Sequence, residues 1–241
     1  MIPLRDNAAP RRLTPINTTL IFANIVVFIY ELSLGARAMI FVARYAMVPA
    51  AVAQALESNA LAWHSLAAHR NIGALEPLMT TVTSLFVHAG LWHVAGNMLY
   101  LFIFGAAVEY RMGARRYLIF YFAGGIAAAL ATVWMAPAST VPVIGASGAI
   151  AGVLGAYFIL YPRGRILTIL PIFIFIQFVE IPAVIYLLFW FAVQLYAGLE
   201  EGGRAGTMGG VAWWAHVGGF MFGVALGPML AMNRPRRRRS H

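Results

Sequence analysis

The sequence predicts an all-α, polytopic membrane protein with six transmembrane helices and a long first external loop. Of its 241 residues, 61% are hydrophobic and 10% are charged, whereas a soluble domain carries about 25% charged residues. The charges are clustered, and residues 117–162 contain none. The uncharged runs approach the roughly 20 residues that a helix needs to cross a bilayer.

Six apolar segments meet or approach that length. They lie at residues 13–30, 91–108, 117–135, 145–161, 181–199 and 211–232. A further apolar stretch, residues 166–179, is short and contains Pro171, so we expect an interfacial segment rather than a span. Residues 34–90, between the first two spans, form the long external loop.

Arginines orient these spans, because all 17 basic residues are arginine. With six spans both termini share one side, which then holds 13 arginines against four on the other. The positive-inside rule places that side in the cytoplasm, as for a multi-pass protein of the cell (inner) membrane. We expect a cytoplasmic tail at residues 1–12, a membrane domain at 13–232 and an arginine-rich cytoplasmic tail at 233–241.

The formal net charge of +9 raises the question of a nucleic-acid partner. The arginines of the C-terminal tail directly follow a hydrophobic helix, however. Basic clusters in that position bind anionic lipid headgroups. We therefore expect the bilayer, and not nucleic acid, to be the partner of the tail.

Four polar residues stand out among those in the apolar segments: Ser147, His216, His93 and Asn97. Each lies near the outer start of its span, and at about 1.5 Å per residue all fall within roughly 10 Å of the outer boundary. Taken singly, a serine or histidine here is explained by helix packing or an interhelical hydrogen bond. Their shared depth instead favours one functional site, since polar groups in lipid tend to be functional.

Five glycines mark the two segments that carry the serine and the last histidine. They are Gly145, Gly148, Gly152, Gly219 and Gly223. Residues without side chains let helix backbones approach closely. We expect these helices to bring Ser147 and His216 within hydrogen-bond distance.

A serine hydroxyl becomes a nucleophile when a neighbouring base takes its proton, and a neutral His216 can serve as that base. Attack on a carbonyl also builds an oxyanion, which needs fixed donors. His93, Asn97 and the backbone N–H of Ser147 are the candidates. The spacing thus predicts a Ser–His dyad with an oxyanion hole.

The sequence lacks the residues that aspartate-dependent and zinc-dependent proteases require. The only aspartate is Asp6, near the N-terminus, so neither a Ser–His–Asp triad nor an aspartyl dyad can form at the site. His88 and His93 are five residues apart, which does not match the HExxH zinc motif. We expect no metal and no cofactor.

At these residues the sequence resembles the rhomboid family of intramembrane serine proteases. The matching motifs are Gly145-Ala146-Ser147-Gly148, Ala215-His216 followed by Gly219 and Gly223, His93 with Asn97, and Glu109-Tyr110-Arg111. The resemblance covers residues 13–232 and includes the six-helix bacterial form. It implies that Ser147 is the nucleophile and His216 the base, with His93, Asn97 and the Ser147 N–H as the oxyanion hole.

The resemblance also implies substrates: transmembrane segments of single-pass membrane proteins, cleaved near the outer membrane face. One motif departs from the family, because Met79-Thr80 stands where a Trp-Arg pair is common in the first external loop. Bulky side chains on the span at 181–199 are consistent with a gate for lateral substrate access or with a lipid-facing wall. They are Tyr186, Phe189, Trp190, Phe191 and Tyr196.

Two other functions remain as alternatives. One is a catalytically inactive rhomboid-like protein that binds membrane clients, although both Ser147 and His216 are present. The other is a small transporter, which predicts broken helices in paired halves and polar groups at the bilayer midplane. The polar residues of this sequence gather near one face instead.

Overall fold

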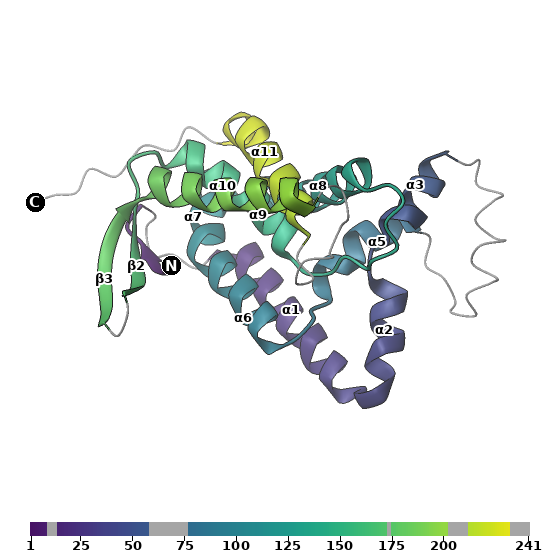
Figure 1. The fold of residues 1–241 in the computed structure, drawn as a ribbon. Coiled ribbons are helices and arrows are strands. Elements are labelled where there is room, and N and C mark those ends of the chain that lie inside the picture. Colours follow the sequence, from purple (N-terminus) through teal and green to yellow (C-terminus); the bar gives the residue numbers. More distant parts are fainter. Residues whose placement is uncertain (9–13, 58–76, 173–174, 202–211, 232–241) are drawn as a thin grey trace, which may run out of the picture.

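The computed structural model describes residues 1–8, 14–57, 77–172, 175–201 and 212–231. Its helices are α1 (Pro15–Ser33), α2 (Ala38–Tyr45), α3 (Pro49–Glu57), α5 (Pro77–Thr83), α6 (Leu91–Tyr100), α7 (Ala106–Met112), α8 (Ala114–Met135), α9 (Ser147–Leu160), α10 (Ala183–Glu201) and α11 (Trp213–Leu230). Its strands are β1 (Ile2–Asp6), β2 (Arg165–Ile172) and β3 (Phe175–Pro182). The fold is mostly helical, with the strands at one end of the molecule and α3 at the other (Figure 1).

Four helical segments are long and apolar enough to cross a membrane. They are Pro15–Ser33, Leu91–Met112, Ala114–Met135 and Ala183–Glu201. The second of these joins α6 to α7 through a π-helical turn, Leu101–Gly105. Within the described residues, four of the six expected spans therefore combine the required length and hydropathy. Helix α9 has only 14 residues, and α11 has 18.

The short helix α9 is almost entirely enclosed by the rest of the fold. Eleven of its 14 residues are buried, and it packs against α11 and α8. A helix that is apolar on all sides is typical of such a buried position. At about 1.5 Å per residue its 14 residues reach only about 21 Å, which is less than the roughly 30 Å thickness of a bilayer's hydrocarbon core.

The strands correct the all-α expectation. They form one antiparallel sheet in the order β1-β2-β3, and β2 pairs with β3 through partners such as Ile166 with Ile181 and Ile169 with Phe178. Residues 166–179, expected as an interfacial segment, supply most of this hairpin. The stretch is rich in β-branched and aromatic residues, which favour strands, and too short to span a bilayer as a helix.

Residues 2–6, expected only as part of a tail, form β1 and pair with β2. The strand end is also held by a side chain, because the Tyr157 hydroxyl of α9 donates to Asp6 Oδ2 at 3.1 Å. The N-terminal segment therefore packs against the C-terminal end of α9.

Glu109, from the Glu109-Tyr110-Arg111 motif, joins α7 to the start of α1. Its carboxylate accepts hydrogen bonds from the backbone N–H groups of Ile16 and Asn17, at 3.2 and 2.7 Å. The first N–H groups of a helix have no partner within the helix, and a carboxylate there also interacts favourably with the helix dipole. The buried acid thus fixes where α1 begins.

The segment expected as the first external loop is partly helical, and its residues 58–76 lie outside the described residues. Helix α3 and the residues just before it pack on α8, because Val52 and Met47 are buried against Ala129 and Val133. Met47 also forms an isolated antiparallel bridge with Val143. In the Met79-Thr80 pair of α5, Met79 is exposed and Thr80 is buried, its hydroxyl donating to the Pro77 carbonyl at 2.6 Å.

Candidate active site

Ser147 is the first residue of α9 and is partly exposed. The chain reaches it through Gly145, whose φ of +110° is a conformation that favours glycine. The Gly145 N–H donates to the carbonyl of Ser84 at 2.9 Å, which anchors this turn. The serine therefore stands on a fixed corner where an extended segment becomes a buried helix.

A glycine seam, formed by Gly148, Gly152, Gly219 and Gly223, lies where α9 meets α11. A Cβ built on Gly152 would lie 3.4 Å from the carbonyl oxygen of Gly219. A Cβ on Gly219 would collide with the Gly148 carbonyl oxygen, and one on Gly223 with that of Gly152. The two backbones are thus in direct contact, as expected from the sequence.

This contact predicts a stability effect at Gly219. We expect Gly219→Ala to lower the thermal unfolding temperature in detergent, because overpacking a tight contact costs about 1–3 kcal/mol. Gly96→Ala is the matched control, since a Cβ there meets nothing within 4 Å. Equal unfolding temperatures for the two variants would contradict the seam.

His93 and Asn97 of α6 lie against the turn that precedes Ser147. A Cβ built on Gly145 would be 2.7 Å from His93 Nε2 and 3.4 Å from Asn97 Nδ2. Asn97 is buried, and its Nδ2 has no hydrogen-bond partner within the described part of the chain. A buried unpaired donor is unusual, and this one lies beside Gly145, which precedes Ser147 by two residues.

The neighbours of His93 indicate which of its ring nitrogens carries the proton. Nδ1 accepts a hydrogen bond from the Ala89 N–H at 3.3 Å, so in the neutral ring Nε2 is the protonated donor. That is the nitrogen closest to Gly145. The ring of His88 packs beside His93 with 5.1 Å between centroids, and burial lowers the pKa of His88 to about 4, which keeps it neutral.

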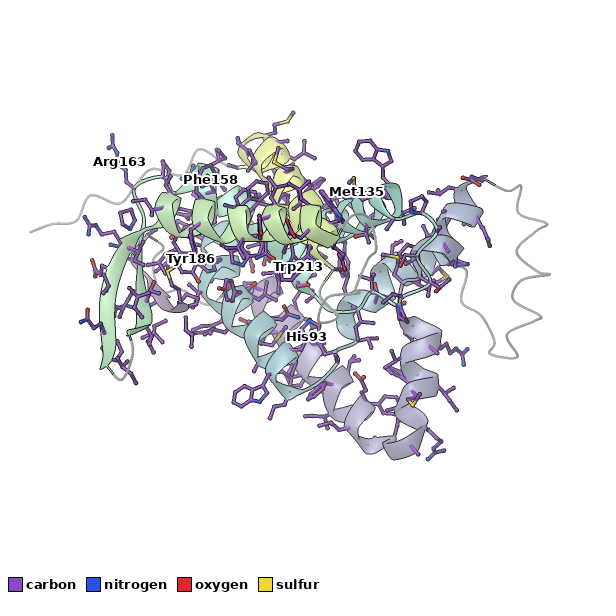
Figure 2. All side chains as sticks on the ribbon, in the orientation of Figure 1. His93, Met135, Phe158, Arg163, Tyr186 and Trp213 are labelled. Atoms are coloured by element: carbon purple, nitrogen blue, oxygen red, sulfur yellow. The ribbon has the colours of Figure 1, made fainter. Side chains whose placement is uncertain are left out.

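His216 lies in the first turn of α11 and is buried. The preceding residue, Ala215, faces α9, because its Cβ would lie 3.6 Å from a Cβ on Gly148. His216 is also near enough to His93 of α6 for their charges to interact. Figure 2 labels His93 and, at the start of α11, Trp213, whose ring centroid is 6.3 Å from that of His216.

Helices α6, α9 and α11 thus bring the expected residues close together, but the expected hydrogen bond between Ser147 and His216 is not formed within the described residues. The ring hydrogen bond of His216 runs from Nδ1 to Gln194 Oε1 of α10, at 2.7 Å, and within the described residues none joins it to Ser147. Gln194 was not among the residues expected from the sequence. The available signal was a single amide within an otherwise apolar run of α10.

Comparison with known proteins identifies the family of the domain that carries these residues. Residues 76–233 match the rhomboid domain. The chain is 32% identical over 167 residues to the yeast (Saccharomyces cerevisiae) protein named rhomboid protein 1, mitochondrial, covering 67% of this chain and 45% of that one. It is 34% identical over 148 residues to the Bacillus subtilis rhomboid protease GluP, covering 61% of this chain and 25% of that protein.

A second Bacillus subtilis protein, named putative rhomboid protease YdcA, is 38% identical over 76 residues, which are 32% of this chain and 38% of that protein. The chain therefore spans between a quarter and about half the length of these curated relatives. The rhomboid match extends from α5 to the end of α11 and includes every residue of the candidate site. With a matching domain over most of its length, this multi-pass membrane protein belongs to the rhomboid family.

Proposed function

We propose that this chain is an intramembrane serine endopeptidase. It cleaves transmembrane segments of single-pass membrane proteins near the outer membrane face, through a dyad of Ser147 and His216. The observation that carries the proposal is the approach of α6 and α11 to the first turn of α9, with Asn97 Nδ2 buried and unpaired within the described residues beside Gly145. The relatives named as rhomboid proteases support it.

In the proposed reaction the Ser147 hydroxyl attacks the carbonyl carbon of the scissile peptide bond. His216 Nε2 takes the hydroxyl proton and passes it to the leaving amine, and water then hydrolyses the acyl-enzyme by the same route. The oxyanion accepts hydrogen bonds from Asn97 Nδ2, His93 Nε2–H and the Ser147 N–H. That N–H stands at the first residue of α9, where helix donors have no partner within the helix.

The proposed topology has six spans, with α9 and α11 added to the four longer segments. Both termini lie in the cytoplasm of a cell with an inner membrane, as the arginine distribution favours. The pairing of β1 with the β2–β3 hairpin supports this topology, because the six-span count places both segments on the cytoplasmic side. The arginine-rich tail, 233–241, lies outside the described residues and is proposed to bind anionic headgroups.

The aromatic residues of α10 divide into two groups. Phe189 and Tyr196 are exposed, as suits a lipid-facing wall. Tyr186 is buried, and its hydroxyl lies 2.7 Å from that of Tyr100 on α6. If α10 gates substrate access, the contact that must open is the one between Tyr186 of α10 and Tyr100 of α6.

Covalent labelling with a fluorophosphonate, followed by peptide mass spectrometry, tests the proposal. We expect the purified protein to react at Ser147 alone, because a neighbouring base activates only that serine. An unlabelled but folded protein would instead favour the alternative, a catalytically inactive rhomboid-like protein that binds membrane clients. Modification of another serine would remove Ser147 from its proposed role.

A further inference from the structure

Gln194 of α10 occupies the place beside the catalytic histidine that a carboxylate holds in a Ser–His–Asp triad. Its side chain is 6% exposed, and its two amide atoms have different partners. Nε2 donates to the carbonyl oxygen of Trp190 at 3.2 Å, while Oε1 lies 2.7 Å from His216 Nδ1. The sequence suggested that no third group was present, because it lacks a suitable aspartate.

The contact with Trp190 defines the orientation of the amide. A backbone carbonyl only accepts hydrogen bonds, so the NH₂ group of Gln194 must face it. The carbonyl oxygen Oε1 then necessarily faces His216. A flipped amide would place its oxygen against the carbonyl oxygen of Trp190, and two acceptors cannot share a hydrogen bond. Its NH₂ group would then face His216 Nδ1.

The orientation of the amide in turn defines the tautomer of His216. Because Oε1 only accepts, Nδ1 must carry the proton. A neutral imidazole protonated at Nδ1 has its lone pair on Nε2, which is the form that acts as a base. The hydrogen bond therefore selects the reactive tautomer.

Aromatic side chains hold the same ring in place. Trp190 lies 5.8 Å from His216 between centroids, and Trp213 meets it edge-on at 6.3 Å. Trp190 thus contacts the histidine ring and also accepts the hydrogen bond from Gln194. With His216 buried, the ring is held from α10 and from its own helix.

We propose that Gln194 is a positioning residue, which holds His216 with Nδ1 protonated and Nε2 free to take the proton of Ser147. The inference rests on the proposed function and adds a third member to its dyad. When His216 becomes doubly protonated during attack, Oε1 keeps accepting from Nδ1. Hydrogen bonds to charged groups are stronger than neutral ones, so the contact strengthens as the proton moves.

Two replacements of similar length separate this role from packing. Gln194→Met fills the same space without an acceptor, and we expect it to lower kcat by about 10- to 100-fold with KM unchanged, as for loss of a hydrogen bond to a charged group. Gln194→Glu keeps an acceptor, and we expect it to retain kcat within about tenfold of wild type. Val193→Met, on the exposed side of α10, is the control and should match wild type.

The pH dependence of kcat provides a readout that a packing role would not change. We expect the acid limb of the Gln194→Glu profile to move to higher pH, because a carboxylate favours the protonated imidazole. Among the described residues, the titratable group whose charge would act on His216 is His93 of α6, which is the same in all three proteins. An unmoved profile, or equal losses in the Met and Glu variants, would overturn the proposal.

These experiments distinguish failure of the Gln194 proposal from failure of the proposed protease function. If wild type fails to react with a fluorophosphonate, the proposed protease function fails. If wild type reacts and Gln194→Met is as active, only the role of Gln194 fails. Should the Met variant unfold, the profile of the Glu variant against wild type still decides.

Discussion

Replacing Ser147 or His216 with alanine is expected to abolish cleavage of a transmembrane substrate. In the proposed reaction the two side chains act in one proton transfer, so the loss of either stops it. In a serine protease whose residues act as such a unit, removing the serine or the histidine lowers kcat by about 10⁶-fold. Cleavage of a single-pass substrate reconstituted in liposomes measures the effect, and the double variant should be no worse than either single one.

Ser33→Ala is the matched control for Ser147→Ala. Ser33 ends α1, is exposed, and donates its hydroxyl to the Tyr30 carbonyl at 2.6 Å. We expect this variant to cleave as wild type does. Thermal unfolding should show that Ser147→Ala still folds, and substantial cleavage by that variant would exclude Ser147 as the nucleophile.

Asn97→Ala is expected to lower kcat by about 10²- to 10³-fold, or about 2.7–4 kcal/mol, which is the typical effect of losing one oxyanion donor. The Nδ2 of Asn97 is buried and has no partner within the described residues. Its removal should therefore break no ground-state hydrogen bond from that nitrogen. Steady-state kinetics on the same liposome substrate should show the loss in kcat with little change in KM.

Asn24→Ala provides the comparison for Asn97→Ala. Asn24 is a buried amide of α1, and its Nδ2 donates to the Leu20 carbonyl at 2.8 Å. We expect its loss to reduce stability while kcat per folded molecule stays at the wild-type level. Equal kcat values for the Asn97 and Asn24 variants would remove Asn97 from the oxyanion hole.

Hydropathy predicted the helices that face lipid along much of their length, because such helices need long apolar runs. The segments of α1, α6–α7, α8 and α10 meet that requirement. The same reasoning did not anticipate how short α9 is. A helix enclosed by other helices is bounded by the turns that pack on it, and the turn at Gly145 lies two residues before Ser147, where α9 begins.

Hydropathy did not predict the three-stranded sheet. Residues 2–6 and 165–182 are far apart in the chain, and each looks like an isolated polar tail or a short apolar stretch. Pairing supplies the hydrogen bonds that an exposed strand lacks, so β1 is stable only where β2 is already present. A sequence pattern records the period of a single strand and not the identity of its partner.

By itself the sequence predicted the chemical groups of the candidate site and a common depth for them, because helix rise converts residue spacing into depth. The tertiary structure alone decided which atoms meet. Contact between α10 and α11 brings Gln194 to His216, and the turn before α6 leaves His93 Nε2 as a donor. Rotation of one helix against another depends on packing, here on the glycine seam, and such packing is a property of two surfaces that no single segment encodes.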